Sequence, residues 1–423
     1  MARTTTTRFS LYYGGRSADA VTISSAYAGT DGTITLSASV PAGVVVGETI
    51  TDSGGNTYLI TALPGGSDLT CQDFDTTTDP ATGAATIQEA YQSAGAWEAD
   101  LDAAVNTECL KAGDTSMGEC RSAVTFAAGV TINSGNSLGL AATKLTALSG
   151  EEHDGTAGSG VLFTATIDFR PNVAGTVSLL ELSSNAQINS LLNSSLGIIE
   201  RNIVHGRGSV GSIVIRASNK YVHRNIIYNM VNSGSGSSDI QGIYFNVTAI
   251  SPGIFVRSNT IHGITRNTSV TAGSYGIYSV DDADENIQYN IVTQVDGSSG
   301  GSHDCYSQSA PSNAVMDHNI ASDTTASGTG SADSIDPADL YVNTTVGFED
   351  LHLKDGADSN ALEIGAGLGT TNGVNIDIDG TDVDDLGLTW DAGAHQKSIT
   401  SFVPFPHPRG LVGGMLNHSG GAL

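Results

Sequence analysis

The sequence predicts an all-β protein whose main body is a solenoid, a parallel β-helix of stacked coils. Three observations support this fold class. Glycine is abundant, with 52 of 423 residues, and short β-prone runs alternate with turns of Gly, Ser and Asn. An asparagine-centred phrase returns at a period within the roughly 20–50 residues that indicate a repeat architecture. Only one segment has the spacing of an amphipathic helix.

The repeated phrase reads "ERNIVHG", "HRNIIYN", "RSNTIHG", "QYNIVTQ" and "DHNIASD". Equivalent residues of stacked coils lie above one another at the strand spacing of about 4.8 Å. Side-chain amides in such a column can bond to each other and to the backbone, so we interpret the asparagines as a buried structural ladder rather than as catalytic groups. The predicted ladder consists of Asn202, Asn225, Asn259, Asn290 and Asn319.

A second phrase, "SIVIR", "GIYFN", "GIYSV" and "DCYSQ", precedes four of the asparagines, and three of its members carry a tyrosine. Because side chains alternate along a strand, we expect Tyr244, Tyr278 and Tyr306 to point outward from one face. Such a strip of rings would bind sugar rings or a neighbouring protein, or its rings would only stack on each other.

The pattern divides the chain into four parts. Residues 1–80 contain short β runs split by Gly and Pro turns and predict a small β barrel or sandwich, an anchor or assembly domain. Residues 85–105 predict a helix that starts at a Thr86–Glu89 capping box and covers the open end of the coil stack. Residues 106–396 carry the predicted parallel β-helix, and residues 397–423 an extended C-terminal tail.

The charge balance argues against several partners. There are 17 Lys+Arg and 44 Asp+Glu, so the net charge is 17 − 44 = −27, which would repel a phosphate backbone, and no nucleic acid is expected. No stretch approaches the roughly 18 apolar residues of a membrane span, and no apolar run follows the basic residues of "MARTTTTRFS". We therefore expect no membrane insertion, no signal peptide, and synthesis in a cytoplasm.

Other clusters have structural and chemical interpretations. The run "DIDGTDVDD" is either a capping turn or a structural Ca²⁺ site with Asp377, Asp379 and Asp384 as ligands. The acidic run "DDADE" at 281–285 is interpreted as a solvated turn, and His205 and His262 as an exposed coil surface. The four cysteines lack the spacing of a zinc site, and whether Cys109 and Cys120 pair is left open.

The end of the chain resembles a known family. "DLHLKDGADSNALEIGAG" and "DIDGTDVDDLGLTWDAGA" are similar to the closing phrases of right-handed, single-stranded parallel β-helix proteins of the pectate-lyase-like superfold. The matching positions include Asp350, His352, Asp379 and Ala394, whereas Asp358-Ser359-Asn360 replaces the usual Ser-Pro, and the arginine expected after Asp-Gly is missing. "ATIQEAYQSAGAWEADL" and "EEHDGTAGSG" are similar to β-helix proteins encoded by bacteriophages.

The resemblance implies a function class. We expect a non-catalytic structural virion protein, a head decoration or a tail spike or fibre, that presents its rod for assembly or for attachment to a host surface glycan. Its expected partners are other virion proteins, bound through the N-terminal domain and the C-terminal tail, with a homo-oligomer such as a trimer left open. The alternative is an enzyme, a polysaccharide lyase or hydrolase, because the superfold hosts both. An enzyme would need a catalytic carboxylate set on adjacent coils, which the sequence does not display.

Overall fold

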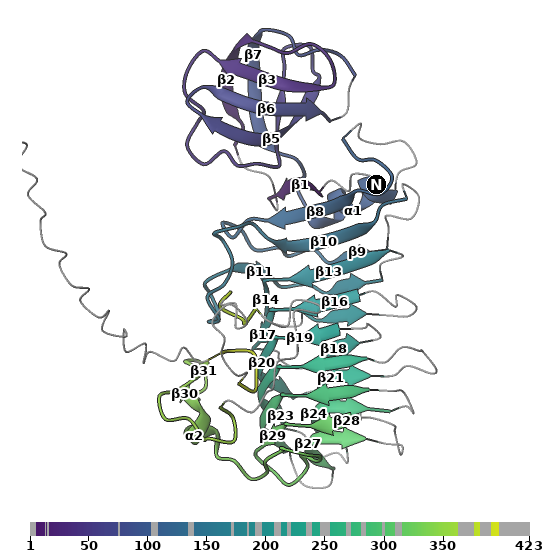
Figure 1. Cartoon of the computed structure of the whole chain (residues 1–423), viewed down its shortest axis with the longest axis vertical. Helices are drawn as coiled ribbons and strands as arrows, with labels where there is room; N and C mark the ends of the chain where they lie inside the picture. Colours follow the sequence, from purple (N-terminus) through teal and green to yellow (C-terminus); the bar gives the residue numbers. More distant parts are fainter. Residues whose placement is uncertain are drawn as a thin grey trace, which may run out of the picture.

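The computed structural model consists of a long stack of parallel strands with a small barrel at its N-terminal end (Figure 1). It describes residues 6–12, 14, 17–74, 77–102, 109–133, 139–170, 173–183, 186–190, 197–206, 213–217, 221–233, 239–245, 254–267, 272–280, 285–297, 301–308, 315–362, 376–380 and 391–396. The protein is therefore all-β, with large parallel sheets and a barrel. No helix in these ranges has the length and apolar character to cross a membrane.

The parallel stack contains three sheets, and from β10 (Ala142–Ala147) onward consecutive strands enter the three in turn. The nine-stranded sheet consists of β1 (Thr6–Leu11), β8 (Thr115–Cys120), β10 (Ala142–Ala147), β13 (Ala174–Ser178), β16 (Gly197–Glu200), β19 (Tyr221–His223), β22 (Phe255–Arg257), β25 (Asn286–Gln288) and β28 (Val315–Asp317). The β11–β29 sheet consists of β11 (Val161–Phe163), β14 (Leu180–Ser183), β17 (Ile203–His205), β20 (Ile226–Asn232), β23 (Thr260–Arg266), β26 (Ile291–Gly297) and β29 (Ile320–Ala321). The β9–β27 sheet consists of β9 (Val130–Ile132), β12 (Ile167–Phe169), β15 (Ile188–Ser190), β18 (Ile213–Ala217), β21 (Ile240–Phe245), β24 (Ser274–Ser279) and β27 (His303–Gln308).

The main core is a column of apolar side chains contributed by all three sheets. Ile199, Ile227 and Ile243 represent the three sheets in it, and all are fully buried. Short strands rich in Ile and Val suit this packing because branched side chains fit well against their neighbours on a pleated surface.

The N-terminal barrel is closed and antiparallel. It contains β2 (Asp19–Ser25), β3 (Asp31–Leu36), β6 (Asp68–Asp73), β5 (Thr57–Gly65), β4 (Glu48–Thr51) and β7 (Gly83–Glu89), in that order around the barrel. Strand β1 precedes the barrel in sequence but pairs with β8 of the stack. The barrel is fastened there, because Ser10 N–H donates to Gly47 O (2.8 Å) and Arg121 pairs with the fully buried side chain of Glu48 (3.1 Å). The barrel therefore differs from the predicted domain 1–80 at both ends, because it excludes β1 and includes β7.

The predicted helix is shorter than expected. Helix α1 spans Ala94–Asp102, whereas Thr86 and Glu89 lie in strand β7, so the capping-box interpretation is wrong. Ala85, Ile87 and Glu89 are buried alternately, which is the period of a strand paired on both sides. Helix α1 itself lies against β8, where the Trp97 Nε1–H donates to Ser116 Oγ (3.1 Å).

The last part of the described chain does not add strands to the three sheets. Helix α2 (Pro337–Leu340) leads into a hairpin of β30 (Tyr341–Asn343) and β31 (Asp350–Leu353). We call residues 337–362, 376–380 and 391–396 the closing segment. Its apolar side chains, among them Tyr341, Leu351 and Ala394, pack with Ile226 and Ile291 of the β11–β29 sheet. The closing segment therefore lies beside the stack (Figure 1).

Candidate functional site

The five asparagines lie in one column at the bend between the nine-stranded sheet and the β11–β29 sheet. All are fully buried, and each Nδ2 of the first four donates to the Oδ1 of the next asparagine at 3.0–3.1 Å. Each Nδ2 also donates to a backbone carbonyl, such as Val222 O for Asn259 (2.9 Å). The amides are therefore committed to holding successive turns together, which is a structural role.

A second column, which the sequence reasoning missed, immediately precedes the ladder. Each residue before a ladder asparagine has a positive φ between 50° and 58°, in the left-handed region that favours glycine. This conformation turns the chain sharply from one sheet to the next. Arg, Ser, Tyr and His fill these positions, so composition gave no signal. The residues are Arg201, Arg224, Ser258, Tyr289 and His318.

The tyrosine strip is shorter than predicted. Tyr244 and Tyr278 are register partners, with ring centroids 5.9 Å apart, and Tyr275 stacks on Tyr278 at 4.5 Å. Tyr306 does not belong to it, because it pairs with Ile277, and Ser307 is the partner of Tyr278. A slip of one residue moves a side chain to the other face of a strand. Tyr306 is accordingly buried, and its hydroxyl donates to backbone oxygens of residues 290 and 320.

The two histidines interpreted as an exposed coil surface differ in their surroundings. His262 is 3% exposed, contacts the ring of Tyr341, and has its pKa lowered to about 4 by burial. His205 is half-buried, and its Nε2 lies 2.7 Å from Glu181 Oε1. For His262 the exposed interpretation is wrong, because the closing segment covers this row of the β11–β29 sheet.

The remaining sequence candidates are spread over the molecule. Of the acidic run at 281–285, only Glu285 is among the described residues, and it is buried and accepts a hydrogen bond from Ser279 Oγ (2.6 Å). All four cysteines are buried and free, so Cys109 and Cys120 are not paired.

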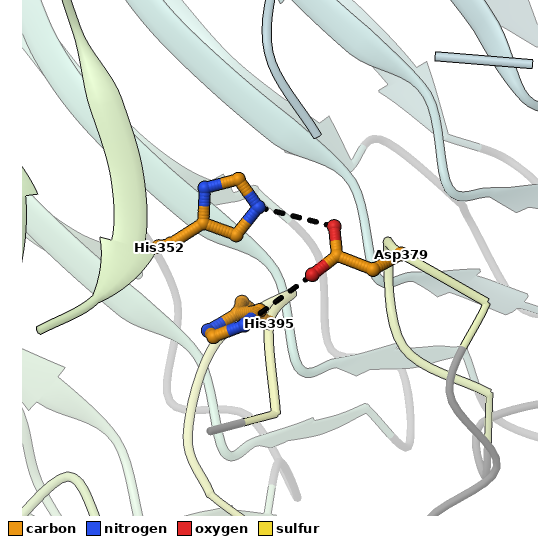
Figure 2. Close-up of side chains that lie close together, drawn as sticks. All are labelled: His352, Asp379 and His395. Atoms are coloured by element: carbon orange, nitrogen blue, oxygen red, sulfur yellow. Dashed lines mark hydrogen bonds and ion pairs between the residues drawn. The ribbon is translucent and has the colours of Figure 1, made fainter. Parts of the chain in front are cut away.

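The closing segment brings together a polar cluster that the sequence did not predict as a cluster, although Asp350, His352 and Asp379 were each named there. Asp350 and His352 lie on β31, Asp379 lies in the turn that follows Asp377, and His395 lies near the end of the described chain. Figure 2 shows Asp379 beside the two imidazole rings, with one carboxylate oxygen directed to each. The distances are 3.1 Å from Oδ1 to His352 Nε2 and 3.3 Å from Oδ2 to His395 Nε2.

The hydrogen bonds fix the protons in this cluster. Both ring nitrogens of His352 face carboxylates, because Nδ1 lies 2.5 Å from Asp350 Oδ1, so both donate only when the ring is protonated. Burial alone would lower the pKa of His352, but the hydrogen bonds and charges of Asp379 and Asp350 outweigh it and raise the pKa to about 9. His352 is therefore an imidazolium at neutral pH.

His395 has the opposite protonation state. Burial first, and then the charge of His352, lower its pKa to about 4, although Asp379 opposes the shift. Leu353 N–H donates to His395 Nδ1 (3.1 Å), so the proton of the neutral ring lies on Nε2 and points to Asp379. The cluster is thus a chain of alternating groups, a carboxylate, an imidazolium, a carboxylate and a neutral imidazole.

A transition metal does not fit this arrangement well. One atom each of His352, Asp379 and His395 lies within 4.8 Å of the others, which is a plausible ligand spacing. However, a metal ligand needs a lone pair on His395 Nε2, and the Leu353 amide already holds the lone pair of Nδ1. The His352 imidazolium has no lone pair either, so the described geometry offers one ligand of the three, Asp379.

The calcium hypothesis remains a prediction. The two carboxylate oxygens of the fully buried Asp377 accept from the backbone amides of Asp379 and Gln396, each at 3.1 Å. Asp379 bonds to the two histidines, and Asp384 lies outside the described residues. Asp377 therefore joins residues 376–380 to residues 391–396 of the closing segment.

The same segment is anchored to the coils by Arg224. This fully buried guanidinium donates from Nη1 to Gly393 O (3.0 Å), and Gly393 N–H donates to Tyr289 O (2.7 Å). Burial lowers the pKa of Arg224 to about 10, against the charges of Asp377 and Asp391. A Cβ on Gly393 would lie 2.7 Å from Thr260 Oγ1, so the "DAGA" phrase needs glycine at this position.

A loop from the other end of the stack completes the cluster. Gly155, in the "EEHDGTAGSG" phrase, has φ +86°, and a Cβ there would lie 2.5 Å from His352 Nε2 and 2.7 Å from Asp379 Oδ1. The two phrases that carry the family resemblance therefore meet at one place. Chemically, the site can fasten the closing segment to the stack, and its groups are engaged in doing so. No protein-family model, curated protein or solved structure matches this chain.

Proposed function

We propose that this chain is a non-catalytic structural protein of a bacteriophage particle, and that its three parallel sheets are the faces of one right-handed parallel β-helix. The observation that carries the structural role is the ladder of buried amides, reinforced by the hydrogen-bonded cluster of the closing segment. In both the ladder and the cluster, residue types that often act in catalysis form hydrogen bonds within the chain instead. The particle assignment rests on the resemblance of "ATIQEAYQSAGAWEADL" and "EEHDGTAGSG" to β-helix proteins encoded by bacteriophages.

The proposed architecture suits such a role. The strand order through three sheets supports a rod wound from a single chain, and the barrel fastened at one end supports an attachment domain. The strongly acidic surface keeps copies apart in solution until a specific contact forms. Other proteins of the particle are the expected partners.

Fractionation of an infected lysate tests the proposal. Particles purified through a density gradient should contain the chain in a constant ratio to the major coat protein, measured by quantitative mass spectrometry. A chain that stays in the soluble fraction, with none in the particle band, would contradict the proposal.

Glycan binding is a second candidate, because Tyr275 and Tyr278 form a stacked, half-buried pair of rings next to Tyr244. Flat aromatic faces are suited to sugar rings. Tyr278→Ala should weaken binding to host-surface polysaccharide in a glycan array. The matched control is Tyr221→Ala, which removes a ring of a different stacked pair, Tyr221 and Phe255 on the nine-stranded sheet. Equal binding by both variants would remove this candidate.

The enzyme alternative stays a prediction. Incubation of the protein with capsular or alginate-type polysaccharide, followed by assays for new reducing ends and unsaturated products, separates it from the structural proposal. A structural protein leaves the polymer unchanged.

A further inference from the structure

Strand β1 is the end strand of the nine-stranded sheet, and it lies between β8 and the barrel (Figure 1). Ser10 N–H donates to Gly47 O (2.8 Å), and Ser10 O accepts from Tyr91 N–H (3.2 Å), so both backbone groups of Ser10 point away from β8. The backbone groups of alternate residues in a strand point to the same side. Those of Thr6 and Arg8 therefore point away from β8 as well, toward the barrel.

This part of the β1 edge is open. The backbone N–H and C=O groups of Thr6 and Arg8 have no hydrogen-bond partner within the described residues, in contrast to those of Ser10. A row of unpaired N–H and C=O groups is the template on which a further strand can pair. The nine-stranded sheet can therefore accept one more short strand at its N-terminal end.

A cavity lies where that strand would be. It has a volume of about 450 Å³ and separates β1 from the barrel strands β3, β5 and β6. Thr6, Thr7 and Arg8 line it from β1, and Val46 and Leu59 supply apolar lining from the barrel. The volume falls within the roughly 300–1,000 Å³ of ligand sites, which often form between domains.

A second hollow extends the cleft and carries negative charge. It has a volume of about 180 Å³ and shares Asp31 and Gln72 with the first. Its charged lining residues are three aspartates and one lysine, Asp31, Asp73, Asp114 and Lys111. Asp31 is exposed and has no hydrogen bond or ion pair within the described residues. The hollow therefore favours a cationic side chain, and the net charge of −27 attracts a basic partner.

We propose that the cleft between β1 and the barrel receives an extended, basic peptide segment of a partner protein. The backbone of the segment pairs with the open edge at Thr6 and Arg8, and a Lys or Arg side chain reaches Asp31. In strand addition, main-chain hydrogen bonds supply affinity and side-chain pockets supply specificity. A peptide uses both the edge and the two hollows, whereas a small molecule leaves much of the edge unpaired. The inference does not depend on the particle role.

An NMR titration of the full, isotope-labelled chain with the basic hexapeptide Ac-VKVKVK-NH2 tests the proposal. We expect saturable shifts of the amide signals of Arg8, Thr70 and Gln72, which line the cleft. The dissociation constant should be on the order of 1 mM, because the open edge is short. The acidic hexapeptide Ac-VEVEVE-NH2 is the matched control and should bind at least tenfold more weakly.

Two substitutions of Arg8 separate backbone pairing from the arginine side chain. Arg8→Pro and Arg8→Ala both remove the ion pair with Glu119 (2.7 Å), but only proline also removes the N–H that faces the cleft. Proline is tolerated where the N–H of an edge strand points outward, so the pairing with β8 should persist. Arg8→Pro should raise the dissociation constant of the basic hexapeptide at least tenfold above that of Arg8→Ala, and circular dichroism checks that both variants fold.

A variant of the barrel tests the charge without touching β1. Asp31→Asn changes an exposed side chain and should weaken binding of the basic hexapeptide severalfold. Four results would each overturn the proposal: a titration without saturable shifts, equal binding of the two hexapeptides, equal binding by the two Arg8 variants, or unchanged binding by Asp31→Asn.

Discussion

Replacing Asn259 by alanine removes the middle rung of the ladder. The side chain accepts from Asn225 N–H and Nδ2 (3.1 and 3.0 Å) and donates to Asn290 Oδ1 and Val222 O (3.0 and 2.9 Å). Asn225 Nδ2 keeps two carbonyl partners, and Asn290 Oδ1 keeps the amide of residue 259. Two buried groups, Asn225 N–H and Val222 O, lose a partner in a site that water cannot reach.

The free energy of unfolding should fall accordingly. An unsatisfied buried polar group costs about 1–3 kcal/mol, so the two groups and the cavity together predict a loss of about 3–5 kcal/mol. Guanidinium chloride unfolding, followed by far-ultraviolet circular dichroism, measures this loss. The control is Asn286→Ala, which changes a half-buried asparagine on β25 outside the ladder and should cost less than about 0.5 kcal/mol. Equal effects of the two substitutions would refute the mechanical interpretation of the ladder.

Three further predictions concern the turns and the closing segment. Ser258→Gly should stabilise the protein by about 1 kcal/mol in thermal unfolding, because Ser258 has φ 54° and a buried hydroxyl with no partner in the described residues; a loss would contradict this. Gly155→Ala should destabilise it and lower the NMR-measured pKa of His352, because the new Cβ would meet the cluster; an unchanged pKa would contradict the described contact. The His352 pKa of about 9 lies above its usual 6.5 or so, so its stabilisation is complete below pH 6.5 and lost as the pH rises through 9. The destabilisation caused by His352→Gln should therefore shrink between pH 6.5 and 10, and a constant difference would argue against the charged pair.

The sequence was most informative where one residue repeats in register. Five similar phrases placed Asn202 to Asn319 in successive coils, and the hydrogen bonds between them follow from that stacking. The prediction for Tyr306 was wrong because spacing alone cannot detect a register shift of one residue. With that shift the Tyr306 side chain points to the interior of the stack. The start of the helix was also predicted wrongly. The residues there are buried alternately, as in a strand, and they form β7.

The candidate site was only partly within reach of the sequence. The resemblance had already marked Asp350, His352 and Asp379 as fold markers, and the acidic run had marked Asp379 as a calcium ligand. Their meeting with Gly155 depends on the folding of the closing segment back along the stack, a long-range contact that no local pattern encodes. No sequence pattern pointed to His395, because its role depends on the Leu353 amide and the Asp379 carboxylate that face it in the folded chain.

Native-state hydrogen exchange of the ladder amides tests the central claim most directly. The backbone N–H of Asn202, Asn225, Asn259 and Asn290 each donates to the side-chain oxygen of the next asparagine at 3.0–3.1 Å. If the ladder holds the stack together, these amides should exchange only through global unfolding, in the slowest class of the protein. Exchange at the rate of exposed turn amides would contradict a mechanical role for the asparagines.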